Sequence, residues 1–523
     1  MNRKYFVALL FSLLILLVYP HYLRWVGVTP SEKTSYQEVR REPLPISSAP
    51  KEKPSGANQI QFQNKFYEAV FSNVGGSIEL LKQGDTLFYK SGPGEKGIFG
   101  VRILQEAQDL SQEIFQLAPS QEKGGAPQFV YEKPGEYRLA KKFFMANDRP
   151  SFVMEIELEN LSDRERHFPL QLEYGLHLEV HDRADDTKVK ILRFLSGEVQ
   201  TTHMGALRKK PLVTSEALEW HGLTKKYYAL LVKPDFTLIG QETHLQEEEL
   251  MSTLQFSPLT LAPGEKKQIH VLVYAGPEQY ERLKELGFGF EKIFSSGTLG
   301  ILRIGLLRTL KFFYRISHNY GVAILLLTLL IKLLFTPFTH MSYQSMQKMQ
   351  ALQPKIRAFQ TQHKNDPARL NKELMELYRR NRVNPMMGCL PLVLQIPIFI
   401  AFYQVLSEAV ELKGAGFIGW IKDLSIPDRI FSFPVTLPFV GDSFNLLPIL
   451  MIGSMLWQQK LTPQTAADPM QAKMMYLTPL IFGFVFYSLP SGLVLYWIAN
   501  NLLTIFHQLF IKRIPIILHH EDA

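Results

Sequence analysis

The chain has a single cysteine, Cys389, among its 523 residues, which excludes an intramolecular disulfide and a cysteine-based metal site. Common enzyme signatures are missing as well: the sequence has no Walker-A loop, no H-E-x-x-H zinc motif, no dinucleotide-binding glycine pattern and no G-x-S-x-G turn. The net charge is only +8 at pH 7, so the composition does not indicate direct nucleic acid binding. We therefore predict a protein without cofactor or metal, and not an enzyme.

One constellation in the first half of the chain could still carry chemistry. His177, Glu179 and His181 alternate along a predicted strand, so they would share one face and could hold a metal or a sugar. Such a trio is more often a solvated strand face, which is the interpretation that we prefer. A membrane-tethered carbohydrate enzyme is kept as an alternative.

Two halves of opposite character follow one another along the chain. Residues 58–285 hold short alternating runs separated by turn clusters such as Gly75-Gly76, and this pattern predicts one large antiparallel β-sandwich. From about residue 300 onward, long apolar runs dominate and predict a polytopic α-helical membrane domain.

The N-terminal segment resembles a signal sequence. Residues 5–19 are apolar after Arg3 and Lys4, and no A-x-A-like cleavage site follows them. We expect residues 1–26 to be an uncleaved signal anchor with a cytoplasmic N-terminus; the alternative is a cleaved signal peptide. Residues 27–57, rich in Pro, Ser, Lys and Glu, are predicted to be a flexible linker that precedes the sandwich.

Together with the anchor, the apolar runs predict six membrane spans. The five further runs are 320–338, 390–406, 446–457, 474–489 and 493–511. The run 474–489 would be roughly 24 Å long as a helix against about 30 Å of hydrocarbon, so either the bilayer thins there or the helix starts earlier, near Pro469. Residues 286–318, with interleaved Arg and Leu, predict an amphipathic helix on the outer interface, the alternative being an ordinary surface helix.

Charge in the loops predicts the orientation of these spans. The loop 339–388 carries nine Lys and Arg against three acidic residues, whereas the loop 411–444 carries three against four. The positive-inside rule places the first loop in the cytoplasm and the second outside, and it puts the short tail, residues 512–523, inside. The sandwich that follows the anchor is then outside the cytoplasm.

Lys332 is the most informative residue of the membrane half. It lies within the otherwise apolar run 320–338, where a cation costs at least about 2.5–3.5 kcal/mol and is expected to face a protein interior or a wet cavity. Thr328 and Thr336, four residues to either side, share its helix face. The alternative is a lysine that snorkels to the nearer interface.

Other spans offer polar side chains that could line the same hollow. These candidates are Gln458, Gln459, Trp497, Asn500 and Asn501. Each of them alone could be an interhelical hydrogen bond or an interface anchor. Pro490-Ser491-Gly492 lies between two apolar runs and predicts a tight outer turn.

Residues 341–386 predict a cytoplasmic helical hairpin. Its first helix would run over 341–363, and Asp366-Pro367 would cap and begin the second. The methionines of the first helix could contact varied apolar clients, although most of its apolar stripe is expected to pack on the second helix. The predicted client contacts here are Met346, Met349 and Leu352.

At this point the residues resemble a known family, the YidC membrane protein insertases with relatives in mitochondria and chloroplasts. The matching stretches are Ser345–Lys355 (SMQKMQALQPK), Asn384-Pro385, Gly388–Pro391 (GCLP), Gln395–Phe399 (QIPIF) and Pro490–Trp497 (PSGLVLYW). More weakly, Phe71–Gly76 (FSNVGG) resembles the start of the periplasmic domain of the Gram-negative members.

The resemblance implies a six-span inner-membrane protein with a five-helix insertase core over 319–511 and an all-β periplasmic supersandwich domain, shaped like sugar mutarotases but without known catalysis. It implies insertion and folding of other membrane proteins through a positively charged hydrophilic groove, with Lys332 as the groove charge and Tyr496 as a further client contact. The implied partners are nascent membrane-protein clients, the Sec translocon, the ribosome and targeting factors, and the lipid bilayer.

The chain departs from the family pattern at two places. Lys332 stands where the family usually has arginine, which keeps the charge but not bidentate pairing with a carboxylate. The tail 512–523 is short, so the resemblance does not extend to tail-mediated ribosome docking. The alternative function from another class is a small-solute transporter with a periplasmic binding domain.

Overall fold

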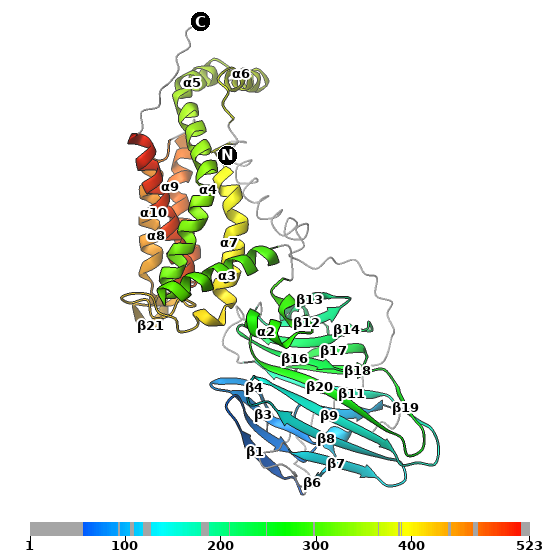
Figure 1. The fold of residues 1–523 in the computed structure, drawn as a ribbon. Coiled ribbons are helices and arrows are strands. Elements are labelled where there is room, and N and C mark those ends of the chain that lie inside the picture. Colours follow the sequence, from blue (N-terminus) through cyan, green and yellow to red (C-terminus); the bar gives the residue numbers. More distant parts are fainter. Residues whose placement is uncertain are drawn as a thin grey trace. The chain divides into compact units, whose positions relative to one another are not determined.

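The structure is a computed structural model, and it describes residues 56–92, 95–104, 109–118, 127–178, 188–208, 210–246, 248–295, 299–363, 366–384, 387–388, 390–437, 441–463 and 469–513. The chain forms two compact units, Met1–Thr298 and Leu299–Ala523; the first is built of strands and the second mainly of helices (Figure 1). The prediction of a β-rich half followed by a helical half is confirmed. The predicted anchor, nearly all of the linker, Glu179, His181, Cys389 and most of the tail lie outside the described residues.

The β unit consists of antiparallel sheets. The largest has nine strands in the order β13-β12-β15-β16-β20-β9-β8-β7-β6. Its strands are β6 (Gln116–Ala118), β7 (Gln128–Lys133), β8 (Tyr137–Met145), β9 (Ser151–Asn160), β12 (Lys190–Leu195), β13 (Glu198–His203), β15 (Trp220–Lys225), β16 (Tyr228–Pro234) and β20 (Lys266–Pro277).

A five-stranded sheet in the order β14-β17-β18-β11-β5 shares its core with the large sheet. Its strands are β5 (Gly100–Ile103), β11 (Leu170–His177), β14 (Leu212–Thr214), β17 (Leu238–Gln246) and β18 (Glu249–Phe256). A four-stranded sheet and a short pair complete the unit: β1 (Gln59–Gln63), β2 (Glu68–Ser72), β3 (Ser77–Gln83) and β4 (Thr86–Lys90), then β10 (Arg166–Phe168) with β19 (Leu259–Leu261).

The strand period of two explains how this core is built. Along β9, Phe152, Met154, Ile156 and Leu158 are buried, whereas the intervening residues are mostly glutamates with greater exposure. One register therefore places every apolar side chain of the strand inside, and β8 and β20 pair with it over most of its length.

Lys141 is an exception to this apolar interior. It occupies an inward position of β8, between Leu139 and Phe143, and is fully buried. Its amino group donates to the carbonyl oxygens of Gly75 at 2.6 Å and Phe99 at 2.7 Å. These two acceptors match the two N–H groups of a neutral amine, and burial lowers the pKa of Lys141 from 10.5 to about 7.

Gly75 supplies one of those carbonyl groups from a turn that requires glycine. Its φ is +68°, and a Cβ atom there would lie 2.6 Å from the carbonyl oxygen of Ser111. The Gly75-Gly76 pair singled out in the sequence is thus needed both for the left-handed turn and for close backbone approach.

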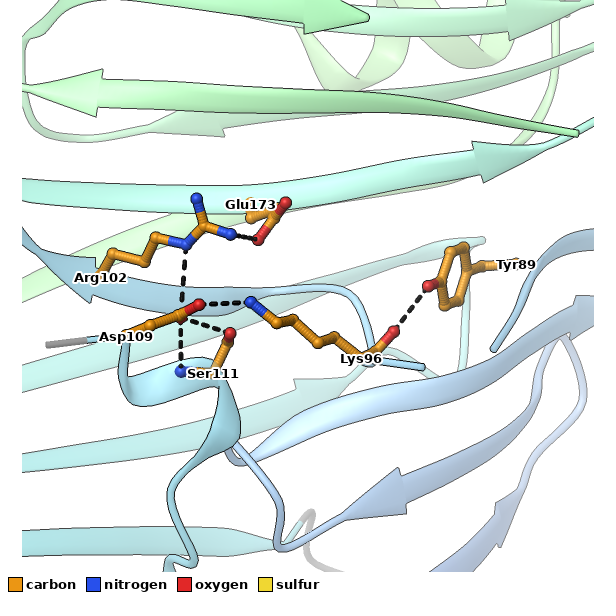
Figure 2. A network of polar contacts seen from close by, with 6 residues as sticks. All are labelled: Tyr89, Lys96, Arg102, Asp109, Ser111 and Glu173. Atoms are coloured by element: carbon orange, nitrogen blue, oxygen red, sulfur yellow. Dashed lines mark hydrogen bonds and ion pairs between the residues drawn. The ribbon is translucent and has the colours of Figure 1, made fainter. Parts of the chain in front are cut away.

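Figure 2 shows a polar network that ties β4, β5 and β11 to the 3₁₀ helix η2 (Leu110–Gln112). Asp109 pairs with Lys96 and with Arg102, whose other nitrogen donates to Glu173 at 2.8 Å. Burial would raise the pKa of Asp109, but hydrogen bonds from Lys96 and Ser111 and the charge of Arg102 together lower it below its ordinary value. The Asp109 carboxylate therefore stays ionised, and its ion pairs hold the segment around η2 to the neighbouring strands.

The segment predicted as one interfacial helix over 286–318 is divided. The helix α2 (Tyr280–Leu286) ends at Gly287, and η5 (Phe290–Ile293) packs within the β unit, where the ring of Phe290 contacts Trp220 with centroids 5.2 Å apart. The left-handed backbone at Gly289 separates this turn from α2. The predicted helix is therefore shorter and starts at Gly300, since Phe290 and Phe294 before it are buried.

In the part of the chain that the structure describes, the helical unit has six longer helices and a hairpin extension. They are α3 (Gly300–Ser317), α4 (Tyr320–Ala351), α7 (Leu390–Glu408), α8 (Leu446–Leu461), α9 (Pro469–Phe486) and α10 (Ser491–Arg513). α10 packs on α4, α7 and α8, and α8 also packs on α9. α9 begins at Pro469, the earlier start that the sequence left open. Two ion pairs, Arg303–Glu408 and Lys311–Glu411, tie α3 to the end of α7 and the short η7 (Val410–Leu412).

Membrane-crossing potential differs among these helices. Among the described residues, α4 and the stretch Ser491–Phe510 of α10 are long and apolar enough to cross a membrane. Shorter apolar stretches lie in α7, over Val393–Glu408, and in α9, over Tyr476–Phe486.

The first helix of the hairpin predicted over 341–386 differs from the prediction. α4 continues through Pro337 to Ala351, and the chain then turns at Leu352 into α5 (Gln353–Gln362). Pro354 accounts for this break, because it cannot donate into a continuous helix and suits a first turn. The second helix, α6 (Pro367–Arg380), is capped as predicted, since Asp366 accepts from the Arg369 N–H at 3.0 Å.

The loop between α7 and β21, residues 409–430, lies at the end of the helical unit opposite α5 and α6. It leads from α7 to the hairpin of β21 (Phe431–Leu437) and β22 (Gly441–Phe444) (Figure 1). Asn319, at the start of α4, donates to the carbonyl of Phe417 at 3.1 Å, and the Ser491 hydroxyl, at the start of α10, donates to that of Asp423 at 2.8 Å. The loop is thus bonded to the first residues of two helices.

Asp428 of the same loop holds the start of a third helix. One of its carboxylate oxygens accepts from the backbone N–H groups of Leu446 and Leu447, at 2.9 and 3.0 Å, and from the Trp420 indole at 2.9 Å. Helix N-termini carry N–H groups without intrahelical partners, so a buried carboxylate from a distant segment caps α8.

We predict that the pH dependence of stability depends on Lys141. Between its folded pKa of about 7 and its unfolded value of 10.5, the unfolded chain binds more protons, so the free energy of unfolding rises with pH across this window. Lys141→Met should remove this rise, measured by urea unfolding of the strands at about pH 7 and about pH 9.5. Lys142→Met is the control, since Lys142 pairs with Glu155 on the outer face. An unchanged rise in Lys141→Met would contradict the prediction.

We predict that Asp428→Ala destabilises the start of α8 by about 1–3 kcal/mol, because two buried N–H groups lose their acceptor. Hydrogen exchange of the Leu446 and Leu447 amides in the purified chain should accelerate accordingly. Asp423→Ala is the control: its side chain accepts only within the loop, from the Ser425 N–H. Equal protection of these amides in wild type and Asp428→Ala would show that the cap is not needed.

Candidate functional site

A cavity of about 330 Å³, in which polar side chains interrupt a mainly apolar lining, lies among four helices of the helical unit. α4, α7, α8 and α10 contribute its walls, and Gly388 lies at its rim. The lining residues are Ile331, Lys332, Phe335, Thr339, Ser342, Tyr343, Met346, Gly388, Pro391, Leu394, Gln395, Ile398, Met455, Gln458, Thr462, Trp497, Asn500, Asn501, Thr504, His507 and Gln508.

Helical periodicity explains why these side chains meet. On α10, Trp497, Asn500, Thr504 and His507 recur every three or four residues and so face one direction. On α4 the lining residues follow a similar spacing, from Lys332 through Phe335 and Thr339 to Met346. The cavity is thus a seam between α4 and α10, where stripes of mixed polar and apolar side chains face each other.

The amine of Lys332 lies at the centre of this seam. It donates to the hydroxyl oxygen of Thr504 on α10, with 2.6 Å between Nζ and Oγ1. The side chains that line the cavity are amides, hydroxyls, an imidazole and apolar groups, and none of these described residues is an aspartate or a glutamate. The ammonium charge of Lys332 is therefore not cancelled by a carboxylate of the lining.

The polar wall opposite α4 is held by side-chain hydrogen bonds between α8 and α10. Asn501 donates to the Ser454 hydroxyl at 2.9 Å, and Gln508 donates to the Thr462 hydroxyl at 3.1 Å. The two bonds lie about two turns apart and fix the register of the helices.

Five residues expected around the groove do line this cavity: Lys332, Gln458, Trp497, Asn500 and Asn501. Gln459 is not in its lining. Thr328 and Thr336 are not in its lining. Thr328 is buried and donates to the carbonyl of Ile324, and Thr336 donates to the carbonyl of Lys332 itself, both at 2.7 Å. Near Lys332, the residues of α4 that line the cavity are Ile331, Phe335 and Thr339 instead.

The expected client contacts are distributed over different surroundings. Met346 lines the cavity. Met349 and Leu352 are buried in a cluster with Ile356, Leu377 and Val383, which corresponds to the sequence alternative that the hairpin stripes pack on each other. Tyr496 is buried as well, and its hydroxyl accepts a hydrogen bond from Gln395.

Sequence reasoning missed Gln395, Thr504, His507 and Gln508 among the polar lining residues. The signal was present on α10, where polar residues recur at 500, 504 and 507. It could not be separated from ordinary interhelical hydrogen bonding without knowing which helix faces α10. Gln395 stands within an apolar run, and the sequence does not show which of its faces is inward.

The trio considered for a metal or sugar site is not described as a group. His177 lies at the end of β11 opposite Glu249, while its two partners fall outside the described residues. Elsewhere in the described part of the chain, no three His, Cys, Asp or Glu side chains are grouped as for a metal ion.

Comparison with known proteins covers both units. Residues 59–307 match the family model described as YidC periplasmic domain, and residues 312–517 match the one described as 60Kd inner membrane protein. A crystal structure of an active YidC insertase with its first transmembrane domain resolved is 21% identical, covers 86% of this chain and 91% of that chain, and has a TM-score of 0.39.

Two curated relatives carry the name membrane protein insertase YidC. The protein of Pelobacter propionicus is 42% identical over 300 residues, which are 57% of this chain and 54% of that protein. The protein of Syntrophus aciditrophicus is 30% identical over 563 residues, which cover 98% of this chain and 100% of that protein. With nearly the whole length matched, and both units matched by family models, the chain belongs to the YidC family of membrane protein insertases.

Proposed function

We propose that this chain inserts membrane proteins by receiving a polar or acidic client segment in the cavity around Lys332. The observation that carries the proposal is an ammonium group among amides and hydroxyls, within apolar helices and without a carboxylate in the described lining. Such a group attracts a client carboxylate and supplies it with hydrogen bonds that hydrocarbon cannot.

The proposed topology has six spans, with the five core helices α4, α7, α8, α9 and α10 following the N-terminal anchor. The excess of Lys and Arg in 339–388 puts the helical hairpin in the cytoplasm of a bacterial inner-membrane protein, and the β unit in the periplasm. Lys332 lies twelve residues from the start of α4, roughly 18 Å along a helix, and so near the middle of a bilayer of about 30 Å.

This placement would shorten the path of the translocated segment through hydrocarbon. The segment would enter from the hairpin side, interact with Lys332, and cross only the outer part of the bilayer unaided. The loop bonded to Asn319 and Ser491 would close the groove outward before a client arrives. Client hydrophobicity and the membrane potential would drive the step, each charge contributing about 2.3 kcal/mol per 100 mV.

The apolar helix of the client would move along α7 and α9. Both helices expose large apolar side chains, among them Val393 and Ile396 on α7 and Leu480 and Phe484 on α9. In a bilayer these surfaces favour lipid or another apolar helix equally, so a client can leave sideways without breaking strong contacts. We further propose a non-enzymatic role in which the Sec translocon, the ribosome and targeting factors are partners, with no direct nucleic acid contact.

We predict that Lys332→Ala slows insertion of clients with an acidic translocated segment by about tenfold. Lys332→Arg should stay near wild type, because the guanidinium keeps the charge and its donors. The measurement is protease protection of a client inserted into proteoliposomes that contain each purified variant. A client with a neutral segment, and Lys460→Ala on the exposed end of α8, are the controls. Acidic-client insertion at the wild-type rate by Lys332→Ala would remove the charge from the mechanism.

Complementation tests the function itself. We expect the wild-type chain to support growth of a bacterium depleted of its own insertase, and Lys332→Ala to fail although it is present in the membrane. Rescue by both chains would keep the insertase function and reduce Lys332 to a snorkelling residue. Failure of both, at normal membrane levels, would contradict the proposed function and favour small-solute transport, which uptake into proteoliposomes would then test.

A further inference from the structure

Thr504 makes two hydrogen bonds that together define its role beside Lys332. Its hydroxyl donates to the carbonyl of Asn500, one turn earlier on α10, at 2.6 Å. A threonine hydroxyl has one proton, so toward Lys332 its oxygen acts as an acceptor, at 2.6 Å from Nζ. The bond to Asn500 therefore orients the Thr504 oxygen independently of Lys332.

An acceptor of this kind holds a cation without cancelling its charge. A carboxylate in the same place would bind the ammonium more strongly, but it would form a buried ion pair and compete with the client. The neutral hydroxyl takes one of the three N–H groups of the ammonium and leaves the others for the cavity. The charge therefore stays available at a defined place.

The alternative position for the amine is the nearer interface. A lysine has a flexible four-carbon stem and can snorkel along an apolar helix toward water. The bond to Thr504 joins α4 to α10 across the cavity, between residues 172 positions apart in the chain. It keeps the amine at the seam of the two helices.

We infer that Thr504 is a positioning residue for the groove charge: it keeps the Lys332 ammonium in the cavity, un-neutralised, where an acidic client segment can reach it. The inference rests on the proposed insertase function. It assigns to Thr504 a part in the preference for clients with acidic segments.

The chain offers a matched control of the same residue type. Thr336 makes the same local bond as Thr504, from its hydroxyl to a carbonyl four residues earlier, but it is not in the cavity lining. Replacing Thr336 by valine removes a back-bonded hydroxyl while leaving the Lys332–Thr504 bond in place.

The experiment compares two clients that differ only in whether the translocated segment is acidic or neutral, inserted into proteoliposomes of the full-length chain. Thr504→Val, which keeps the shape, should slow the acidic client by about tenfold and leave the neutral client unchanged. Thr504→Ser should restore the wild-type rate, since serine supplies the same acceptor. Thr336→Val should insert both clients at the wild-type rate.

A double variant separates positioning from a general structural effect. In the Lys332→Ala background, Thr504→Val should add no further loss, because the two residues act through one bond. If Thr504→Val slows both clients equally, or if its loss adds to that of Lys332→Ala, the role is structural and the inference is overturned. Wild-type insertion of the acidic client by Thr504→Val, alongside a loss in Lys332→Ala, would overturn the inference alone. Wild-type insertion by Lys332→Ala would overturn the role of the charge, and the inference with it.

Discussion

The helical unit depends on how one amine is accommodated between apolar helices. An ammonium group is expensive to remove from water, and pairing it with a carboxylate would offset that cost while removing the charge. The described lining around Lys332 offers hydroxyls and amides instead, and the Thr504 hydroxyl oxygen accepts a hydrogen bond from its amine. These neutral groups come from α7, α8 and α10, and they give the amine polar neighbours without a carboxylate in the described lining.

Hydrogen bonds hold the helices around that cavity together. Asn501 bonds Ser454 and Gln508 bonds Thr462, and these two bonds join α10 to α8. At the end away from the hairpin, Asp428 caps α8 while Asn319 and Ser491 bond the same loop. The loop between α7 and β21 thereby contacts the first residues of α4, α8 and α10.

The β unit accommodates a buried lysine in a different way. Lys141 is buried in an apolar core and satisfied by two backbone carbonyls, which suits a neutral amine and lowers its pKa. Lys332 lies in a cavity that has room for further partners. The two buried lysines therefore differ in the space left around the nitrogen, which is decided by the tertiary structure.

The sequence by itself determined the class of each half, because the period of two in β9 and the apolar lengths of α4 and α10 are local properties. It also singled out Lys332, since one charge in an apolar run is visible without a structure, and it located the Asp366 cap. The tertiary structure decided the partners: that Thr504 faces Lys332, that Thr328 and Thr336 turn to their own helix, and that Met349 packs in the hairpin. These contacts depend on which helices become neighbours and on the rotation of each helix about its axis. Both are settled by packing between segments that are separated in the chain, which no local pattern encodes.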